Sequence, residues 1–203
     1  MLANKGFFLL KSNLTQEVQK EVLAAARAIV RSAPLFRPTM PSGQSFNYLM
    51  TNCGDLGWVA DKYGYRYQQT HPITRNAFPA MPQVIKELAV AIALETGNDD
   101  FCPQSCLLNF YNKGGRLGLH QDNTEKNLSA PIISISLGDT GIFVLGGLLR
   151  TDETKKFIVQ SGDVIVMGGE SRNYFHSFKG IVANTSSLLK NGGRVNLTIR
   201  QVD

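Results

Sequence analysis

Short runs of β-branched and aromatic residues, separated by glycine-rich turns, fill the second half of this chain and limit most strongly the folds open to it. Turn residues such as Gly146-Gly147, Ser161-Gly162-Asp163 and Asn191-Gly192-Gly193 punctuate the runs. Short strands with turns between them predict an antiparallel sandwich or barrel. The runs cover residues 107–111, 132–137, 142–145, 157–160, 164–167 and 195–199.

The first half predicts two helices. Residues 13–32 carry apolar side chains at helical spacing, with Asn13 or Thr15 as the N-cap. A second helix is expected over residues 82–96, which begin with proline. Residues 33–80 are rich in Pro, Gly and aromatic residues, so they predict loops and short strands that serve recognition.

Composition bounds the class of protein. A chain of 203 residues with 43% apolar content can bury a core as one domain. A net charge of +5 and a pI near 9.2 permit a polyanionic partner. The 21 basic residues are spread along the chain without a basic tail, so charge alone favours nucleic acid only weakly.

Cysteine usage and the N-terminus bear on location. Cys53, Cys102 and Cys106 form no CxxC pair, and their odd number argues against a closed disulfide framework, so all three are expected to be reduced. The N-terminal apolar run of four residues is too short for a signal peptide or a membrane span. A cytoplasmic protein without membrane association is expected.

His120-Gln121-Asp122 and the distant His176 form a candidate metal site. Residues i and i+2 of a strand point to one side, so His120 and Asp122 can converge while a later strand supplies His176. Two imidazoles and one carboxylate can occupy one face of Fe(II) and leave three positions open; zinc is the competing metal. Taken alone the pattern is weak, because single histidines such as His71 are more often packed or surface residues than ligands.

The last predicted strand strengthens the iron interpretation. Residues 194–200 alternate polar and apolar side chains, which places Arg194 and Arg200 on one face together with Asn196 and Thr198. An ordinary amphipathic strand would expose that face to water. If the face is inward, two arginines need anions, and a dicarboxylate that also chelates iron satisfies both. The combination predicts an iron and 2-oxoglutarate dioxygenase.

Motifs along most of the chain resemble the AlkB family of Fe(II)- and 2-oxoglutarate-dependent dioxygenases, which repair alkylated nucleic acids. The resemblance rests on a set of short segments that are specific when taken together. They are Met50–Trp58, Pro79–Pro82, Leu119–Asp122, Ala130-Pro131, Gly146–Leu148, Gly168–Arg172, Asn196–Thr198 and Arg200-Gln201.

The resemblance implies a mainly β fold with α-helices (α+β), built on a double-stranded β-helix, or jelly roll. Residues 1–90 would form an N-terminal helix and a nucleotide-recognition lid, and residues 91–203 the catalytic core, in one compact unit. It implies Fe(II), 2-oxoglutarate and O2, with iron held by His120, Asp122 and His176. The implied 2-oxoglutarate residues are Asn109, Tyr111, Arg194, Asn196 and Arg200.

The lid would hold a base that has left the helical stack. Trp58 is the candidate to stack on that base opposite His120; the alternative is a core residue of the lid. Tyr65 and Arg150 match positions expected to contact the nucleic acid, although a solvated arginine is equally ordinary at residue 150. Tyr67 is a further lid aromatic, and Met50 is expected to line the same pocket.

Two departures from the family pattern affect the substrate. Thr124 stands where the family has an acidic residue that contacts the exocyclic edge of the base, and the matching Glu125 follows it. Threonine keeps hydrogen bonding but supplies no negative charge. Residues 40–47 also differ, in the loop expected to touch the DNA backbone. The preferred lesion and strand type are therefore left open.

The expected reaction is oxidative demethylation of N-alkylated bases, of the 1-methyladenine and 3-methylcytosine type, in DNA, with release of formaldehyde, succinate and CO2. A monomer acting on single-stranded DNA or on a flipped base is expected. Alternatives are the same chemistry on alkylated RNA, hydroxylation of a non-nucleic-acid substrate, and a jelly-roll binding module without catalysis.

Overall fold

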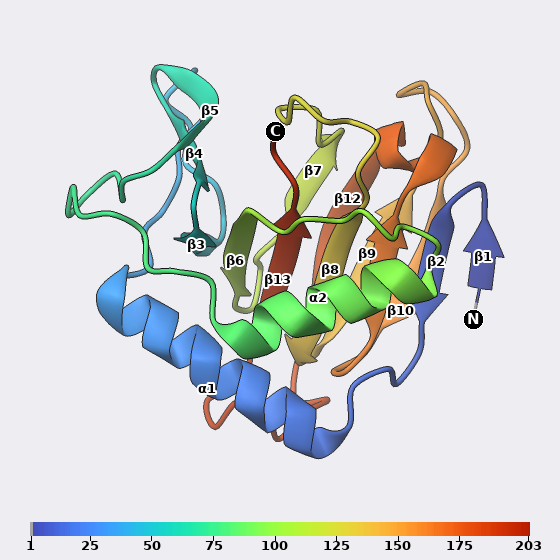
Figure 1. Ribbon diagram of the computed structural model, residues 1–203, viewed down its shortest axis with the longest axis horizontal. Helices are drawn as coiled ribbons and strands as arrows, with labels where there is room; N and C mark the ends of the chain where they lie inside the picture. The colour runs from blue at the N-terminus through green and yellow to red at the C-terminus, as the bar shows by residue number, and fades with distance from the viewer. Residues whose placement is uncertain (1) are drawn as a thin grey trace.

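Two antiparallel sheets packed face to face form the centre of the computed structural model, which describes residues 2–203 (Figure 1). The major sheet has seven strands in the order β1-β2-β11-β8-β13-β6-β3, and the minor sheet has four in the order β10-β9-β12-β7. The major strands are β1 (Leu2–Asn4), β2 (Phe7–Leu10), β3 (Leu49–Gly54), β6 (Ser105–Tyr111), β8 (Ile132–Gly138), β11 (Val164–Met167) and β13 (Arg194–Arg200). The minor strands are β7 (Leu117–His120), β9 (Thr140–Leu145), β10 (Lys155–Val159) and β12 (His176–Val182). This is the predicted jelly-roll architecture.

Two helices, α1 (Gln16–Ser32) and α2 (Gln83–Glu95), cover the outer face of the major sheet, where Figure 1 shows them side by side. Thr15 caps α1, since its hydroxyl accepts a hydrogen bond of 3.3 Å from the backbone N–H of Val18. Both helices begin and end close to the predicted bounds. Neither is long and apolar enough to cross a membrane.

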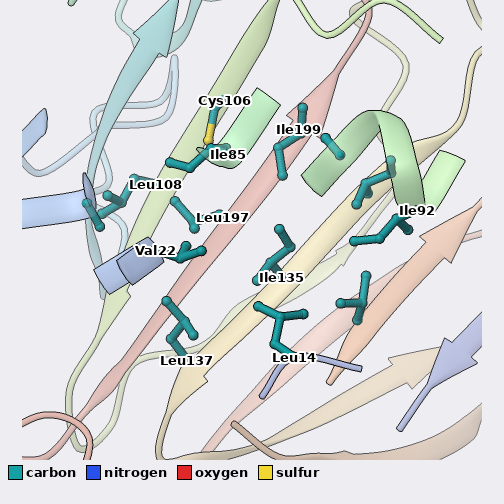
Figure 2. Close-up of a cluster of buried hydrophobic side chains, with 14 of the residues drawn as sticks. Leu14, Val22, Ile85, Ile92, Cys106, Leu108, Ile135, Leu137, Leu197 and Ile199 are labelled. Atoms are coloured by element: carbon teal, nitrogen blue, oxygen red, sulfur yellow. The ribbon is translucent and has the colours of Figure 1, made fainter. Parts of the chain in front are cut away.

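The largest apolar cluster lies between these helices and the major sheet (Figure 2). Val22 of α1 and Ile85 of α2 face Leu197 of β13, and all three are fully buried. Truncation of a side chain such as Leu197 to alanine costs about 2 to 5 kcal/mol. Because the apolar residues of β13 face the helices, its polar residues face the minor sheet, as the alternating sequence predicted.

A second apolar cluster fills part of the space between the two sheets. Phe7 of β2 packs against Phe143 of β9 with ring centroids 6.3 Å apart, and Ile165 and Met167 of β11 belong to the same cluster. The apolar run Phe7–Leu10, which is too short for a membrane span, was not predicted as a strand. The structure assigns it a strand that pairs with β11.

The segment before residue 90 contributes to the major sheet as well as to a separate hairpin. β3 pairs with β6 along its whole length, so residues on both sides of residue 90 share one sheet. β4 (Gly57–Asp61) and β5 (Gly64–Gln68) form a two-stranded hairpin that stands beyond the edge of the sandwich in Figure 1. A 3-10 helix, Gly169–Asn173, precedes β12.

Candidate metal centre and cosubstrate site

Two adjacent strands of the minor sheet and the loop that follows β7 bring His120, Asp122 and His176 together. His120 ends β7, His176 begins β12, and the two residues are directly opposite partners in the pairing of these strands. Their ring centroids are 4.3 Å apart. One ligand atom from each of the three residues lies within 4.8 Å of the others, which is a separation that one metal ion can bridge.

Asp122 reaches this cluster from a loop and not from a strand. The expected i, i+2 geometry on one strand was wrong, because β7 ends at His120. Asp122 is fixed instead by two arginines from other segments. Arg172 donates to its backbone carbonyl, and the NH2 of Arg200 donates to its Oδ2 at 2.6 Å.

Backbone carbonyls orient both imidazoles. Nδ1 of His120 lies 2.8 Å from the carbonyl of Gly118, and Nδ1 of His176 lies 3.1 Å from the carbonyl of Tyr174. An imidazole that donates from Nδ1 presents the lone pair of Nε2. The two Nε2 atoms lie 3.5 and 3.8 Å from the Asp122 carboxylate oxygens, so all three donors face one point.

Electrostatics keeps the cluster close to the protonation state that a metal requires. Burial alone would raise the pKa of Asp122, but Arg200 holds it well below its usual value. Burial, followed by the neighbouring His120, lowers the pKa of His176 to about 4. Burial opposes the charged form of His120 as well, yet the adjacent Asp122 raises its pKa overall. A carboxylate beside neutral His176 suits a divalent cation.

Arg194 is a buried cation without a carboxylate partner among the residues described. Its NH2 donates to the hydroxyl of Ser136 at 2.6 Å, its NH1 lies 3.5 Å from the carbonyl of Val159, and its Nε has no partner. Burial lowers its pKa to about 10. A desolvated guanidinium with an unused donor fits a ligand carboxylate.

Asn109, Tyr111 and Asn196 line the same cavity beside Arg194. Tyr111 is directly opposite Arg194, and Asn109 directly opposite Asn196, in the pairing of β6 with β13. The Oδ1 of Asn109 has no hydrogen-bond partner within the described part of the chain. The five residues expected to bind 2-oxoglutarate therefore lie on two strands of the major sheet and line the same cavity as the candidate metal ligands.

Two serines on β8 bind polar residues that line this cavity, and neither was predicted as a site residue. Ser136 binds Arg194, and the hydroxyl of Ser134 accepts a hydrogen bond of 2.9 Å from Asn196. The signal was present as small polar residues alternating with isoleucine and leucine in Ile132–Leu137. Such alternation marks a strand with one polar face.

The cavity has a volume of about 470 Å³ and opens beside the β4–β5 hairpin. Trp58 and Tyr65 of the hairpin stack with centroids 5.6 Å apart and planes 13° apart, and both line the cavity. Thr124 and Arg150 line it as well. Arg150 is exposed, and its NH2 donates to the carbonyl of Leu119 at 3.0 Å.

Three residues expected at the substrate lie elsewhere. Met50 is fully buried in an apolar cluster with Tyr48 and Val59 and does not line the cavity. Tyr67 donates to Glu125, whose other oxygen is 2.9 Å from Arg172. Tyr67 and Glu125 thus tie the hairpin to the buried arginines and do not line the cavity.

Comparisons with known proteins agree with this geometry. A sequence model of the 2OG-Fe(II) oxygenase superfamily matches residues 6–200. The alpha-ketoglutarate-dependent dioxygenase AlkB of Escherichia coli is 42% identical over 173 residues, which cover 85% of this chain and 80% of that protein. The DNA N(6)-methyladenine demethylase ALKBH1D of Arabidopsis thaliana is 33% identical over 96% of this chain and 49% of its own length. The solved structure of OsALKBH1 superimposes with a TM-score of 0.83 at 30% identity and covers 99% of both chains.

Proposed function

This chain belongs to the AlkB family of 2OG-Fe(II) oxygenases, and from that premise we propose that it demethylates N-alkylated bases in DNA, of the 1-methyladenine and 3-methylcytosine type. It is an Fe(II)- and 2-oxoglutarate-dependent dioxygenase. The observation that carries the proposal is the convergence of two imidazoles and a carboxylate on a cavity lined by Arg194, a buried cation without a carboxylate partner among the described residues.

We assign iron to His120, Asp122 and His176, and 2-oxoglutarate to the wall formed by Asn109, Tyr111, Arg194, Asn196 and Arg200. When bound, iron and its cosubstrate supply the oxidation of a methyl C–H bond by O2. The overall reaction converts base N–CH3, O2 and 2-oxoglutarate into base N–H, formaldehyde, succinate and CO2, and it is balanced.

The protein's own groups bind, orient and shield the reactants. Arg194 would bind one carboxylate of the cosubstrate from within the sandwich, where water is excluded and charge-assisted hydrogen bonds are strong. Arg200 keeps Asp122 ionised and in place through its 2.6 Å hydrogen bond. The carbonyls of Gly118 and Tyr174 keep both imidazoles turned toward the metal position.

The base would enter beneath the β4–β5 hairpin, which we propose as the lid. Trp58 would stack on the base, opposite His120, with Tyr65 at the mouth. A base inside a duplex cannot reach such a cavity, so the substrate is single-stranded DNA or a flipped base. We propose a monomer acting in the cytoplasm, since one chain supplies every residue of the site and its three cysteines are free.

Two other substrates belong to the same chemistry. The plant relative named for DNA N(6)-methyladenine demethylation favours that base as a second candidate. Alkylated RNA remains an alternative polymer because base stacking and a net positive charge suit either nucleic acid.

Two experiments test the proposal in sequence. Anaerobic titration with Fe(II) and 2-oxoglutarate should give a metal-to-ligand charge-transfer absorption that His176→Ala abolishes. Methylated and unmethylated oligonucleotides, as DNA and as RNA, single- and double-stranded, should then be compared for formaldehyde release. Formaldehyde release from methylated DNA, but not from methylated RNA or from unmethylated strands, supports the proposal. Normal charge-transfer absorption without release from any methylated strand would favour a substrate outside nucleic acids.

A further inference from the structure

The charges around the cavity are unbalanced. Arg150, Arg194 and Arg200 line it, whereas Asp122 is the single carboxylate in its lining among the residues described. Asp122 is already paired with Arg200 at 2.6 Å. A ferrous ion and a 2-oxoglutarate dianion cancel each other in charge, so loading the site leaves three guanidinium groups against one carboxylate.

Glu125 does not correct this imbalance. Its side chain is fully buried, receives a hydrogen bond from Tyr67, and lies 2.9 Å from Arg172 and 3.3 Å from Arg200. A carboxylate held by two arginines and a phenol is directed away from the cavity and has no free charge to offer a ligand.

The two residues between Asp122 and Glu125 carry neutral side chains that can form hydrogen bonds. Asn123 and Thr124 both line the cavity, both are exposed, and neither side chain bonds to another described residue. The Thr124 hydroxyl can donate or accept, so it can bind either an amino or a carbonyl edge of a base. A carboxylate at this position would accept only and would attract a cation.

We propose that this cavity accepts electrically neutral N-methylated bases at least as well as cationic ones, and that Thr124 sets this range. The inference rests on the proposed function and concerns the base it prefers. A cationic base gains nothing from a wall with excess positive charge, whereas a neutral base is not penalised by it.

Matched pairs of lesions test the proposal in single-stranded oligonucleotides of one sequence. Adenine and guanine methylated at N1 differ in charge, since 1-methyladenine is cationic at neutral pH and 1-methylguanine is neutral. The pair 3-methylcytosine and 3-methylthymine repeats the comparison on pyrimidines. We would measure kcat/KM from formaldehyde release, and Kd by fluorescence anisotropy of the iron- and 2-oxoglutarate-loaded enzyme without oxygen.

For each pair the wild-type ratio of kcat/KM, neutral over cationic, should be one or more. Thr124→Asp should move the ratio toward the cationic base by about tenfold or more. Thr124→Asn introduces a side chain with the shape of aspartate but without its charge, so it should not move the ratio. A wild-type ratio below one overturns the proposal. If Thr124→Asp and Thr124→Asn shift the ratio equally, the charge at residue 124 does not set the range of bases.

Failure of the proposed function has a different signature. Wild-type enzyme with normal charge-transfer absorption and no formaldehyde from any of the four lesions would refute demethylation itself. In that case, tighter binding of the cationic than of the neutral oligonucleotides would also refute the charge inference. Tighter binding of the neutral oligonucleotides would support it as a property of binding.

Discussion

Arg200 donates a hydrogen bond of 2.6 Å to the Oδ2 of Asp122, and this contact joins the last strand of the major sheet to the candidate iron ligand. The same guanidinium lies 3.3 Å from Glu125, while its NH1 has no hydrogen-bond partner in residues 2–203. One buried side chain thus orders a metal ligand, neutralises a structural carboxylate and keeps a donor for the cosubstrate.

Arg200→Gln should therefore weaken both the fold and the metal site. Removing the cation leaves the largely buried Asp122 carboxylate without its ion pair, which costs about 3 to 5 kcal/mol, whereas Glu125 keeps Arg172 and Tyr67. The free energy of unfolding from chemical denaturation should fall by that amount, and Fe(II) affinity should fall with it. Arg200→Lys keeps the charge and should retain part of the stability. Equal stability of Arg200→Gln and wild type would show that the contact is dispensable.

Arg194→Gln should act on the cosubstrate and spare the metal. A charge-assisted hydrogen bond to a carboxylate contributes about 1.5 to 3 kcal/mol, which corresponds to an increase of roughly 10- to 150-fold in KM for 2-oxoglutarate. The KM for the oligonucleotide should change little. Arg150→Gln is the matched control, since Arg150 also lines the cavity but is exposed, whereas Arg194 is buried. An unchanged KM for 2-oxoglutarate in Arg194→Gln would remove the residue from the cosubstrate site.

The two arginines also show how far the sequence alone leads. Strict alternation in residues 194–200 predicted that they share one face, because side chains of a strand alternate between faces. The structure shows that this face lines the cavity. The position of Asp122 was not predictable in the same way. It depends on Arg172 and Arg200, which are distant in sequence and meet it only after the sheets pack.

Long-range packing explains the other differences. Met50 matched a motif and lies directly opposite Asn109 in the pairing of β3 with β6, yet an apolar cluster covers its side chain. The run Phe7–Leu10 has too few residues to predict its partner, and β11 lies far along the chain. Local patterns predict which face of an element is apolar, whereas register and partner depend on contacts between distant segments.

Stability of the metal-free protein should fall as the pH drops from about 6.5 toward 4, with His176 as a cause. Its folded-state pKa is lowered to about 4, so between these values the unfolded chain binds a proton that the folded chain does not. The contribution is at most about 3 kcal/mol. Denaturation with chelator at pH 7.5 and 4.5 measures it. His176→Gln should lose less stability over this interval than wild type, and an identical loss would contradict the assignment.

Trp58→Ala should weaken substrate binding and leave cosubstrate binding intact. Stacking of a base on an aromatic side chain contributes about 1 to 3 kcal/mol, so kcat/KM for a methylated oligonucleotide should fall by roughly 5- to 150-fold. Trp58→Phe keeps a ring and should recover most of the loss. Tyr63→Ala is the control on the same hairpin, because Tyr63 is 78% exposed and does not line the cavity. If Trp58→Ala and Tyr63→Ala lower kcat/KM equally, Trp58 acts through the stability of the lid and not by stacking on the base.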